Sequence, residues 1–280
     1  MIDLHTHSTL SDGTDPPGRI AELAAAAGCR AVALTDHDTL GGQPEARRRA
    51  GELGIELVPG CEVSCALGDT SAHVLVYFVD TEQSPLGEEL VRLRADRLGR
   101  NRRLAERLAE LGLPATYDEA VAVSGSEESV GRPHFAGVLV EHGAAESVQD
   151  AFDRWLGRGA PAHVRKARVS PAEVSRLARA SGGVAVLAHP LSIGLAPDGL
   201  AGLVADLAET GFAGIEAHYA NYAPEDRAAL VELARRSDVV ATGGSDYHGT
   251  VKPGLAVGTG RGDLSVPDQA LADLEARRPA

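Results

Sequence analysis

The sequence has few cysteines, few aromatic residues and no long apolar run. Its 280 residues include three cysteines, Cys29, Cys61 and Cys65, which form no CxxC pair and are too few for a disulfide framework. No apolar segment approaches the roughly 18 residues that span a bilayer, and no basic segment followed by an apolar one marks a signal peptide. We therefore expect a cytoplasmic protein with reduced, packed cysteines and no membrane partner.

Basic residues are also scarce relative to acidic ones. The chain has 27 Lys and Arg against 40 Asp and Glu, which gives a formal net charge of −13 and an isoelectric point near 5.2. Such a balance argues against a generic binder of duplex DNA, because phosphate contacts need basic side chains. A phosphorylated substrate would need metal ions or a local basic patch to offset this field.

What the sequence does have is a regular alternation of short apolar runs and amphipathic segments. With 44% hydrophobic residues the chain can bury a full core. Expected strands lie near residues 1–4, 30–34, 55–63, 73–79, 184–188, 213–218 and 239–242, and expected helices near 19–27, 43–53, 171–180, 200–209 and 224–236. This order is typical of a parallel α/β sheet or barrel.

The alternation stops at about Pro85 and resumes after residue 168. We interpret residues 85–168 as an inserted helical subdomain. Its first part concentrates positive charge in an otherwise acidic protein, in Arg92, Arg94, Arg97, Arg100, Arg102, Arg103 and Arg107. These arginines form either a solvated helix face with acidic partners or a contact surface for nucleotide or RNA phosphates.

Histidines and carboxylates, the residue types that commonly bind metals, lie where the predicted strands end. His5 and His7 alternate along the first strand, so their side chains face one pocket. Later strands end in Asp36-His37, Glu62, His189 and Asp246-Tyr247-His248, while His73 lies near a strand boundary whose direction the sequence leaves open. The carboxyl ends of barrel strands are where active sites form, so we predict a site for several metal ions at this rim.

Five motifs together resemble the PHP (polymerase and histidinol phosphatase) family. They are His-Thr-His-Ser at 5–8 followed by Ser-Asp-Gly at 11–13, Thr-Asp-His-Asp at 35–38, Gly-Cys-Glu-Val-Ser at 60–64, Ala-His-Pro at 188–190 and Gly-Ser-Asp-Tyr-His-Gly at 244–249. The resemblance implies a distorted (β/α)7 barrel made of residues 1–84 and 169–280, with a helical cap at 85–168. It also implies a trinuclear metal centre with the ligands His5, His7, Asp12, His37, Glu62, His73, His189, Asp246 and His248.

By the same analogy the ligands divide among three ions, with Glu62 as a bridge. The sets are His5, His7, Glu62 and Asp246; Glu62, His73 and His189; and Asp12, His37 and His248. Mixed imidazole and carboxylate ligands suit Mn, Fe or Zn better than Mg, so we expect two to three divalent ions, with Mn first. Some family members carry a histidine where this chain has Asp12.

The insertion contains Gly131-Arg132-Pro133-His134, where a turn meets a helix. On residue types alone, a surface or helix-capping role fits Arg132 better than a phosphate contact does. A PHP barrel of this length with this motif resembles the branch that removes the 3′-phosphate from nucleoside 3′,5′-bisphosphates and trims short RNA from the 5′ end. That resemblance implies that Arg132 and His134 hold the substrate's other phosphate, with Lys166 and His218 as weaker candidates.

The expected reaction is attack on phosphorus by a hydroxide that bridges metal ions. The expected partners are small nucleotides and short single-stranded RNA. One alternative is a histidinol-phosphate phosphatase, which shares the barrel and the metals. The arginine-rich cap argues against this alternative. Another is a non-catalytic, metal-stabilised interaction module, against which the complete set of ligand-type residues argues.

Overall fold

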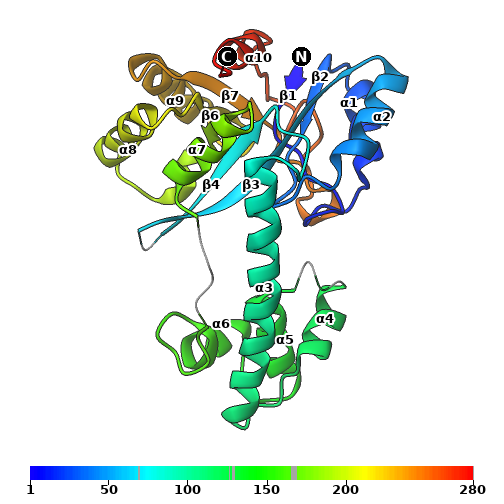
Figure 1. The fold of residues 1–280 in the computed structure, drawn as a ribbon, viewed down its shortest axis with the longest axis vertical. Coiled ribbons are helices and arrows are strands. Elements are labelled where there is room, and N and C mark those ends of the chain that lie inside the picture. The colour runs from blue at the N-terminus through cyan, green and yellow to red at the C-terminus, as the bar shows by residue number, and fades with distance from the viewer. Residues whose placement is uncertain (69, 126, 128–129, 165–168, 280) are drawn as a thin grey trace. The chain divides into compact units, whose positions relative to one another are not determined.

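The computed structural model describes residues 1–68, 70–125, 127, 130–164 and 169–279 (Figure 1). The chain divides into two compact units. Unit 1 comprises residues 1–90 and 168–280, and unit 2 comprises residues 91–167. Helix α3 (Pro85–Glu110) begins in unit 1 and continues into unit 2.

Unit 1 is built on a sheet of seven strands in the described part of the chain, hydrogen-bonded in sequence order. They are β1 (Ile2–Asp3), β2 (Ala31–Leu34), β3 (Glu56–Leu67), β4 (Thr70–Tyr77), β5 (Val184–Leu187), β6 (Gly214–Tyr219) and β7 (Val240–Gly244). The residues that follow β1 lie beside the end of β7. Leu4 N donates to Gly243 O at 3.1 Å, and Asp246 N donates to His5 O at 2.8 Å. These bonds bring the ends of the sheet together, and the predicted distorted (β/α)7 barrel is confirmed.

One strand runs against the others. β1, β2 and β3 are parallel, as are β5, β6 and β7, but β4 is antiparallel to both of its neighbours, β3 and β5. β3 ends at Leu67 and β4 begins at Thr70, which is its register partner, so the chain between these two strands is too short for a helix. Gly68 has φ +57°, a conformation that favours glycine. The beginning of β4 therefore lies at the same rim as the carboxyl ends of the parallel strands.

Helices flank these strands in unit 1. They are α1 (Pro17–Ala26), α2 (Gln43–Leu53), α7 (Pro171–Ala180), α8 (Pro197–Glu209), α9 (Pro224–Arg236) and α10 (Gln269–Ala276), with the short turns η2 (Pro190–Ile193) and η3 (Gly249–Val251). α1 and α2 lie on one side of the strands, and α7, α8 and α9 on the other (Figure 1). Ser170 caps α7 as its sequence predicts, since its hydroxyl accepts from Glu173 N at 3.2 Å.

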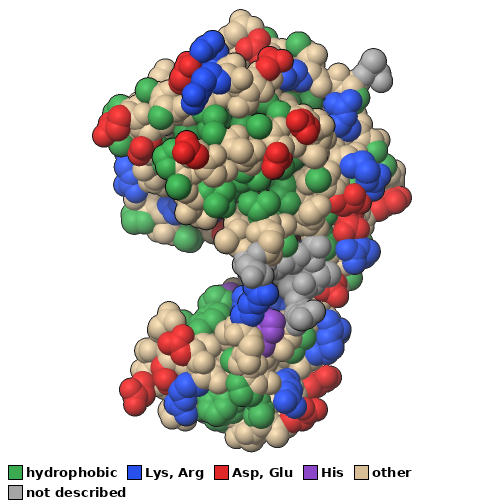
Figure 2. Space-filling view, turned by 90° about the vertical axis from the view of Figure 1, so that its left-hand side faces the viewer, with side chains coloured by type: hydrophobic (Ala, Val, Ile, Leu, Met, Phe, Trp, Pro, Cys, Tyr) green, Lys and Arg blue, Asp and Glu red, His purple; other side chains and the backbone are tan. Residues whose placement is uncertain are grey.

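The core of unit 1 follows from the alternation of its strands. Side chains such as Leu75, Tyr77 and Val186 are buried inside the barrel, and Ile20 and Leu34 belong to a second cluster formed with α1 and α2. The three cysteines are buried, and within the described residues they form no disulfide. On the face shown in Figure 2, acidic and basic side chains are scattered among hydrophobic ones and form no large patch of one sign on the barrel unit.

Unit 2 is helical. After α3 come α4 (Tyr117–Ser124), α5 (Arg132–Glu141), α6 (Val148–Ala151) and the π-helical turn η1 (Phe152–Leu156). They share a core that contains Leu104, Leu108, Phe135 and Leu139. Among the described helices of the chain, none combines the length and the apolar character that a membrane span requires.

Candidate metal centre

The histidines and carboxylates at the strand ends converge on one place in the barrel. His5 and His7 follow β1, His37 follows β2, and His189 follows β5. Glu62 lies within β3, and a single bridge pairs it with His37. The other members of the set are Asp12 in the loop after β1, His73 in the first half of β4, and Asp246 and His248 after β7. The antiparallel direction of β4 explains how His73 reaches this rim.

Glu62 is the hub of the cluster. Its side chain is 1% exposed, and both of its oxygens face imidazole rings. Five ring nitrogens surround it among the described residues: Nε2 of His5, Nε2 of His7 and Nδ1 of His37 at 3.2 Å from Oε2, and Nδ1 of His73 and Nε2 of His189 at 2.9 Å from Oε1. A carboxylate with a separate set of rings at each oxygen is arranged to bridge two cations.

Asp246 completes the part of the cluster near β1. Its Oδ1 lies 3.5 Å from Nε2 of His5 and 3.4 Å from Nε2 of His7. Its Oδ2 accepts from the hydroxyl of Tyr219 at 2.7 Å and pairs with the ammonium of Lys252. Because donors hold one oxygen, the other is oriented toward the imidazoles.

Asp12 and His248 define the opposite side of His7. Oδ1 of Asp12 lies 3.2 Å from Nε2 of His248 and 3.7 Å from Nδ1 of His7, and its Oδ2 lies 3.7 Å from Nε2 of His37. Asp12 is 54% exposed, whereas the rings of His7 and His248 are buried. A ligand set here would therefore be the one most open to solvent.

The spacing of these atoms fits metal ions. Nε2 of His5 and Nε2 of His7 lie 3.0 Å apart, and both face Glu62. Two nitrogens at about 2.1 Å from one ion, at tetrahedral or octahedral angles, lie about 3.0–3.4 Å from each other. Nδ1 of His37 is buried and has no hydrogen-bond partner among the described residues, although Glu62 Oε2 lies 3.2 Å away. An ion between these groups would satisfy nitrogens that otherwise face one another.

Three groups of donor atoms within the described residues lie close enough to share an ion. They are His5, His7, Glu62 and Asp246; His37, Glu62 and His73; and His7, Asp12, His37 and His248. The first is the set that the resemblance implies. The second holds His37 where the resemblance implies His189, although His73 and His189 lie equally close to Oε1 of Glu62. The third adds His7 to the implied set.

Electrostatic interactions within the cluster favour an ionised Glu62 next to a protonated His7. Burial would lower the pKa of His7, but hydrogen bonds with Asp246 and Glu62 raise that pKa to about 9. Burial lowers the pKa of His37 to about 4. Burial would raise the pKa of Glu62, but the charges of His37 and His5 hold it well below its usual range. Metal ions compete with ring protons for such nitrogens.

Two buried carboxylates that support the cluster, Asp36 and Glu216, are not among the nine predicted ligands. Asp36 is buried and accepts from Ser8 N, from the Ser8 hydroxyl and from the Ser11 hydroxyl, each at 2.7 Å. It thereby orders the loop that carries Asp12. Glu216 is buried beside His5. A charged residue within an apolar strand such as 213–218 is the sequence signal that could have identified Glu216.

The two residues predicted to bind substrate lie in unit 2 at the start of α5. Arg132 donates to Leu156 O at 3.3 Å, and its guanidinium lies 5.6 Å from the ring centre of Phe152. Nδ1 of His134 accepts from Gly131 N at 3.0 Å. Lys166, the weaker candidate, lies outside the described residues.

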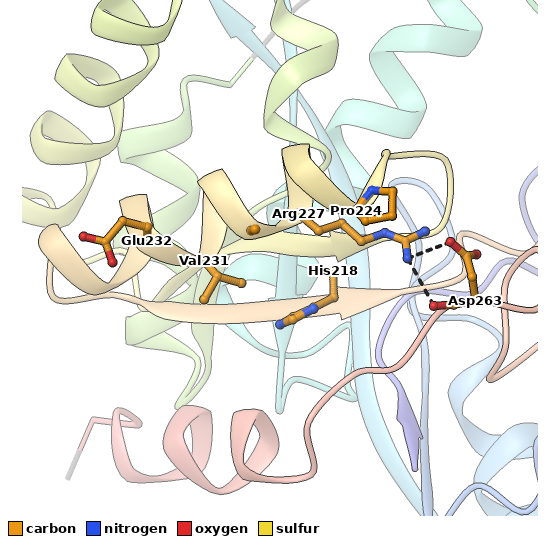
Figure 3. Close-up of a pocket in the computed structure, with 7 residues that line it drawn as sticks. His218, Pro224, Arg227, Val231, Glu232 and Asp263 are labelled. Atoms are coloured by element: carbon orange, nitrogen blue, oxygen red, sulfur yellow. Dashed lines mark hydrogen bonds and ion pairs between the residues drawn. The ribbon is translucent and has the colours of Figure 1, made fainter.

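His218, the other weaker candidate, lies away from the metal cluster. A β-bulge between Glu216 and His218 shifts the alternation of β6. His218 lines a pocket of about 490 Å³ together with residues of α9, among them Arg227, whose guanidinium is bonded to Asp263 (Figure 3). Tyr219, the next residue, instead reaches Asp246.

Comparisons with known proteins agree with this geometry. The family model for the PHP domain matches residues 3–125. A 3′,5′-nucleoside bisphosphate phosphatase of Chromobacterium violaceum is 32% identical over 281 aligned positions, which cover 100% of this chain and 99% of that protein. A 5′-3′ exoribonuclease of Haemophilus influenzae is 33% identical over 246 positions, covering 88% of this chain and 89% of that one.

A solved structure supports the same relationship. It is described as an amidohydrolase from Chromobacterium violaceum with bound sulfate and no metal. Its TM-score to this chain is 0.78 and its sequence identity is 32%. The match covers 100% of this chain and 98% of that chain. The predicted resemblance is confirmed. This chain therefore belongs to the PHP-domain family and is a metal-dependent phosphoesterase.

Proposed function

We propose that this phosphoesterase removes the 3′-phosphate from nucleoside 3′,5′-bisphosphates and releases nucleoside 5′-monophosphate and phosphate. The observation that carries the proposal is the hub at Glu62, where five imidazole nitrogens meet one buried carboxylate among the described residues. The relative from Chromobacterium violaceum, which aligns over the full chain, bears the name of this activity.

In the proposed centre the nine ligands are those that the family resemblance implies, and they hold two to three divalent ions, with Mn²⁺ first. They are His5, His7, Asp12, His37, Glu62, His73, His189, Asp246 and His248. Divalent ions, when bound, acidify water and neutralise the charge of a phosphoryl group. In the reaction, water adds to phosphorus, the bond from phosphorus to O3′ breaks, and the ribose oxygen leaves with a proton.

In the proposal, the helical insertion of residues 85–168 supplies the contacts to the 5′-phosphate. The guanidinium of Arg132 offers a fork that fits phosphate oxygens. Burial lowers the pKa of His134, so this ring is neutral near pH 7, and because Nδ1 accepts from Gly131 its proton is on Nε2. Nε2–H is therefore a donor for a second phosphate oxygen.

A buried arginine in unit 2 adds support for an anion here. Arg100 is 6% exposed, and its Nε has no hydrogen-bond partner among the described residues. Burial, followed by the positive charges of Arg132 and Arg97, lowers the pKa of Arg100 to about 10. Neighbouring arginines repel one another, and a phosphate beside them would relieve this repulsion.

Changing Arg132 to Ala should raise KM for a nucleoside 3′,5′-bisphosphate by about tenfold or more, because a charge-assisted hydrogen bond is worth about 1.5–3 kcal/mol. Hydrolysis of an aryl phosphate, which has no second phosphate, should change little. Steady-state kinetics on both substrates measure the difference. Arg154→Ala is the matched control, since Arg154 is 50% exposed and pairs with Asp150. Equal losses on both substrates would make Arg132 structural.

Adding Mn²⁺ to metal-free protein should raise its melting temperature. An ion that binds only the folded state adds about 2.7 kcal/mol at 100 times its dissociation constant. Differential scanning calorimetry over a series of Mn²⁺ concentrations measures this gain. A melting temperature that does not depend on Mn²⁺ would contradict the proposed centre.

The substrate is tested by comparing phosphate release from adenosine 3′,5′-bisphosphate, histidinol phosphate and a short 5′-phosphorylated RNA in the presence of Mn²⁺. We expect the bisphosphate to give the highest kcat/KM. A preference for histidinol phosphate would keep the centre and replace the substrate, and no hydrolysis by metal-loaded protein would favour a non-catalytic module. Trimming of RNA from the 5′ end is a second candidate activity, favoured by the exoribonuclease of Haemophilus influenzae.

A further inference from the structure

Glu216 is a buried carboxylate that lies just behind the proposed metal ligands. It is 0% exposed, and each of its oxygens serves a different ligand residue. Oε1 lies 2.8 Å from Nδ1 of His5, and Oε2 accepts from the backbone N–H of His189 at 2.8 Å. One side chain on β6 thus connects His5, two residues past β1, with His189, two residues past β5.

The contact with His5 determines which ring nitrogen carries the proton. A carboxylate can only accept here, so Nδ1 of His5 must donate. With the proton on Nδ1, the lone pair of Nε2 is directed at the cluster, where Nε2 lies 3.2 Å from Glu62 and 3.5 Å from Asp246. A carboxylate behind a ligating histidine selects its tautomer and orients its ring in this way.

The contact with His189 holds an unusual backbone. His189 has φ +26° and ψ +62°, a region that a residue with a side chain rarely adopts. Its N–H is bonded to Glu216, and Nδ1 of its ring lies 2.7 Å from the Ser192 hydroxyl. These two contacts leave Nε2 directed at Oε1 of Glu62, 2.9 Å away.

The two residues that Glu216 contacts lie at different oxygens of Glu62. His5 lies at Oε2 and His189 lies at Oε1, so Glu216 supports both ends of the proposed bridge. Nothing in the donor groups places Glu216 itself among the ligands: within the described residues none of the three groups that could share an ion includes it. Its role would be exerted through His5 and His189.

We propose that Glu216 is a positioning residue that fixes the tautomer of His5 and the backbone of His189, and thereby sets the metal affinity on both sides of Glu62. The proposal rests on the metal centre of the proposed function.

The test is Glu216→Gln, which keeps the size of the side chain but replaces one acceptor oxygen with an NH₂ group. Glutamine can satisfy His5 or His189 but not both. Isothermal titration of metal-free protein with Mn²⁺ should show affinity about 10- to 100-fold weaker than in the wild type, the usual range for a residue behind a ligand. Thr242→Val is the control, because Thr242 is the register partner of Glu216 on β7 and is also 0% exposed.

Wild-type Mn²⁺ affinity in Glu216→Gln would overturn the proposal, as would an equal loss of affinity in Thr242→Val. A merely structural role would lower the melting temperature of the metal-free variant without weakening Mn²⁺ binding by the folded protein. The affinities are measured without substrate, so the outcome is independent of the reaction that the loaded enzyme catalyses.

A measurement on the wild-type protein tests the proposed tautomer of His5 even if the variant does not fold. In protein loaded with diamagnetic Zn²⁺, long-range ¹H–¹⁵N NMR spectra report which nitrogen of each histidine carries a proton. We expect His5 to be protonated on Nδ1. A proton on Nε2 of His5 would overturn the proposal.

Discussion

Asp246→Asn should lower kcat on every phosphoester by more than about 100-fold while the fold is retained. Asp246 contributes Oδ1 to the place where His5 and His7 converge. Burial would raise the pKa of Asp246, but His5 and His7 hold it below its usual range, so the native carboxyl is ionised. Asparagine removes this negative charge, and even a residue behind a ligand costs 10- to 100-fold when changed.

The fold should survive this change because asparagine keeps an oxygen that can accept from Tyr219. Steady-state kinetics and circular dichroism of the purified variant measure the two effects. Asp263→Asn is a matched control, since Asp263 is exposed and pairs with Arg227 in the pocket of Figure 3. Turnover at the wild-type rate in Asp246→Asn would remove Asp246 from the centre.

Glu62→Gln should have an effect at least as large, and it should also lower the metal content. Glu62 is the residue with imidazole rings at both oxygens, so its carboxylate is shared by two ions in the proposed centre. A glutamine amide has one oxygen and no charge, and it cannot bridge in the same way. We expect kcat to fall by more than about 100-fold and Mn²⁺ bound per chain to fall by at least one.

Metal analysis of the dialysed protein by mass spectrometry measures this stoichiometry. Glu56→Gln is the control on the same strand, because Glu56 lies at the start of β3, is 44% exposed and lies 3.6 Å from Arg30. An unchanged metal content in Glu62→Gln would contradict the bridging role, whatever happened to turnover.

The barrel could be predicted because its local signals agree with one another. Apolar runs mark the strands, and the capping serine at Ser170 and the proline after it mark the start of α7. The parallel strands all deliver their last residues to one rim, so ligand-type residues such as His5, His37 and His189 could be predicted to lie together.

The direction of β4 could not be predicted, because it depends on how the strand pairs and not on its composition. His73 reaches the rim only because β4 is antiparallel to β3 and β5. The bulge in β6 is a similar case: strict alternation would place Glu216 and His218 on one side, but the structure sends His218 to the pocket with Arg227. Both features arise from pairing between distant segments.

The partners of the supporting residues could not be predicted from the sequence, although the position of Glu216 in an apolar strand marks it as unusual. Glu216 and Asp36 bond to residues far along the chain, Glu216 to His5 and His189, and Asp36 to Ser8 and Ser11. A motif identifies a ligand by its neighbours in the chain, but a residue behind a ligand is defined by contacts that only the folded barrel creates.

The most direct measurement is the identity of the products from adenosine 3′,5′-bisphosphate with Mn²⁺-loaded protein, followed by ³¹P NMR. The proposed function predicts one equivalent of inorganic phosphate and adenosine 5′-monophosphate, with no reaction after chelation of the metal. Release of adenosine 3′-monophosphate, or no release of phosphate by protein with full metal content, would contradict it.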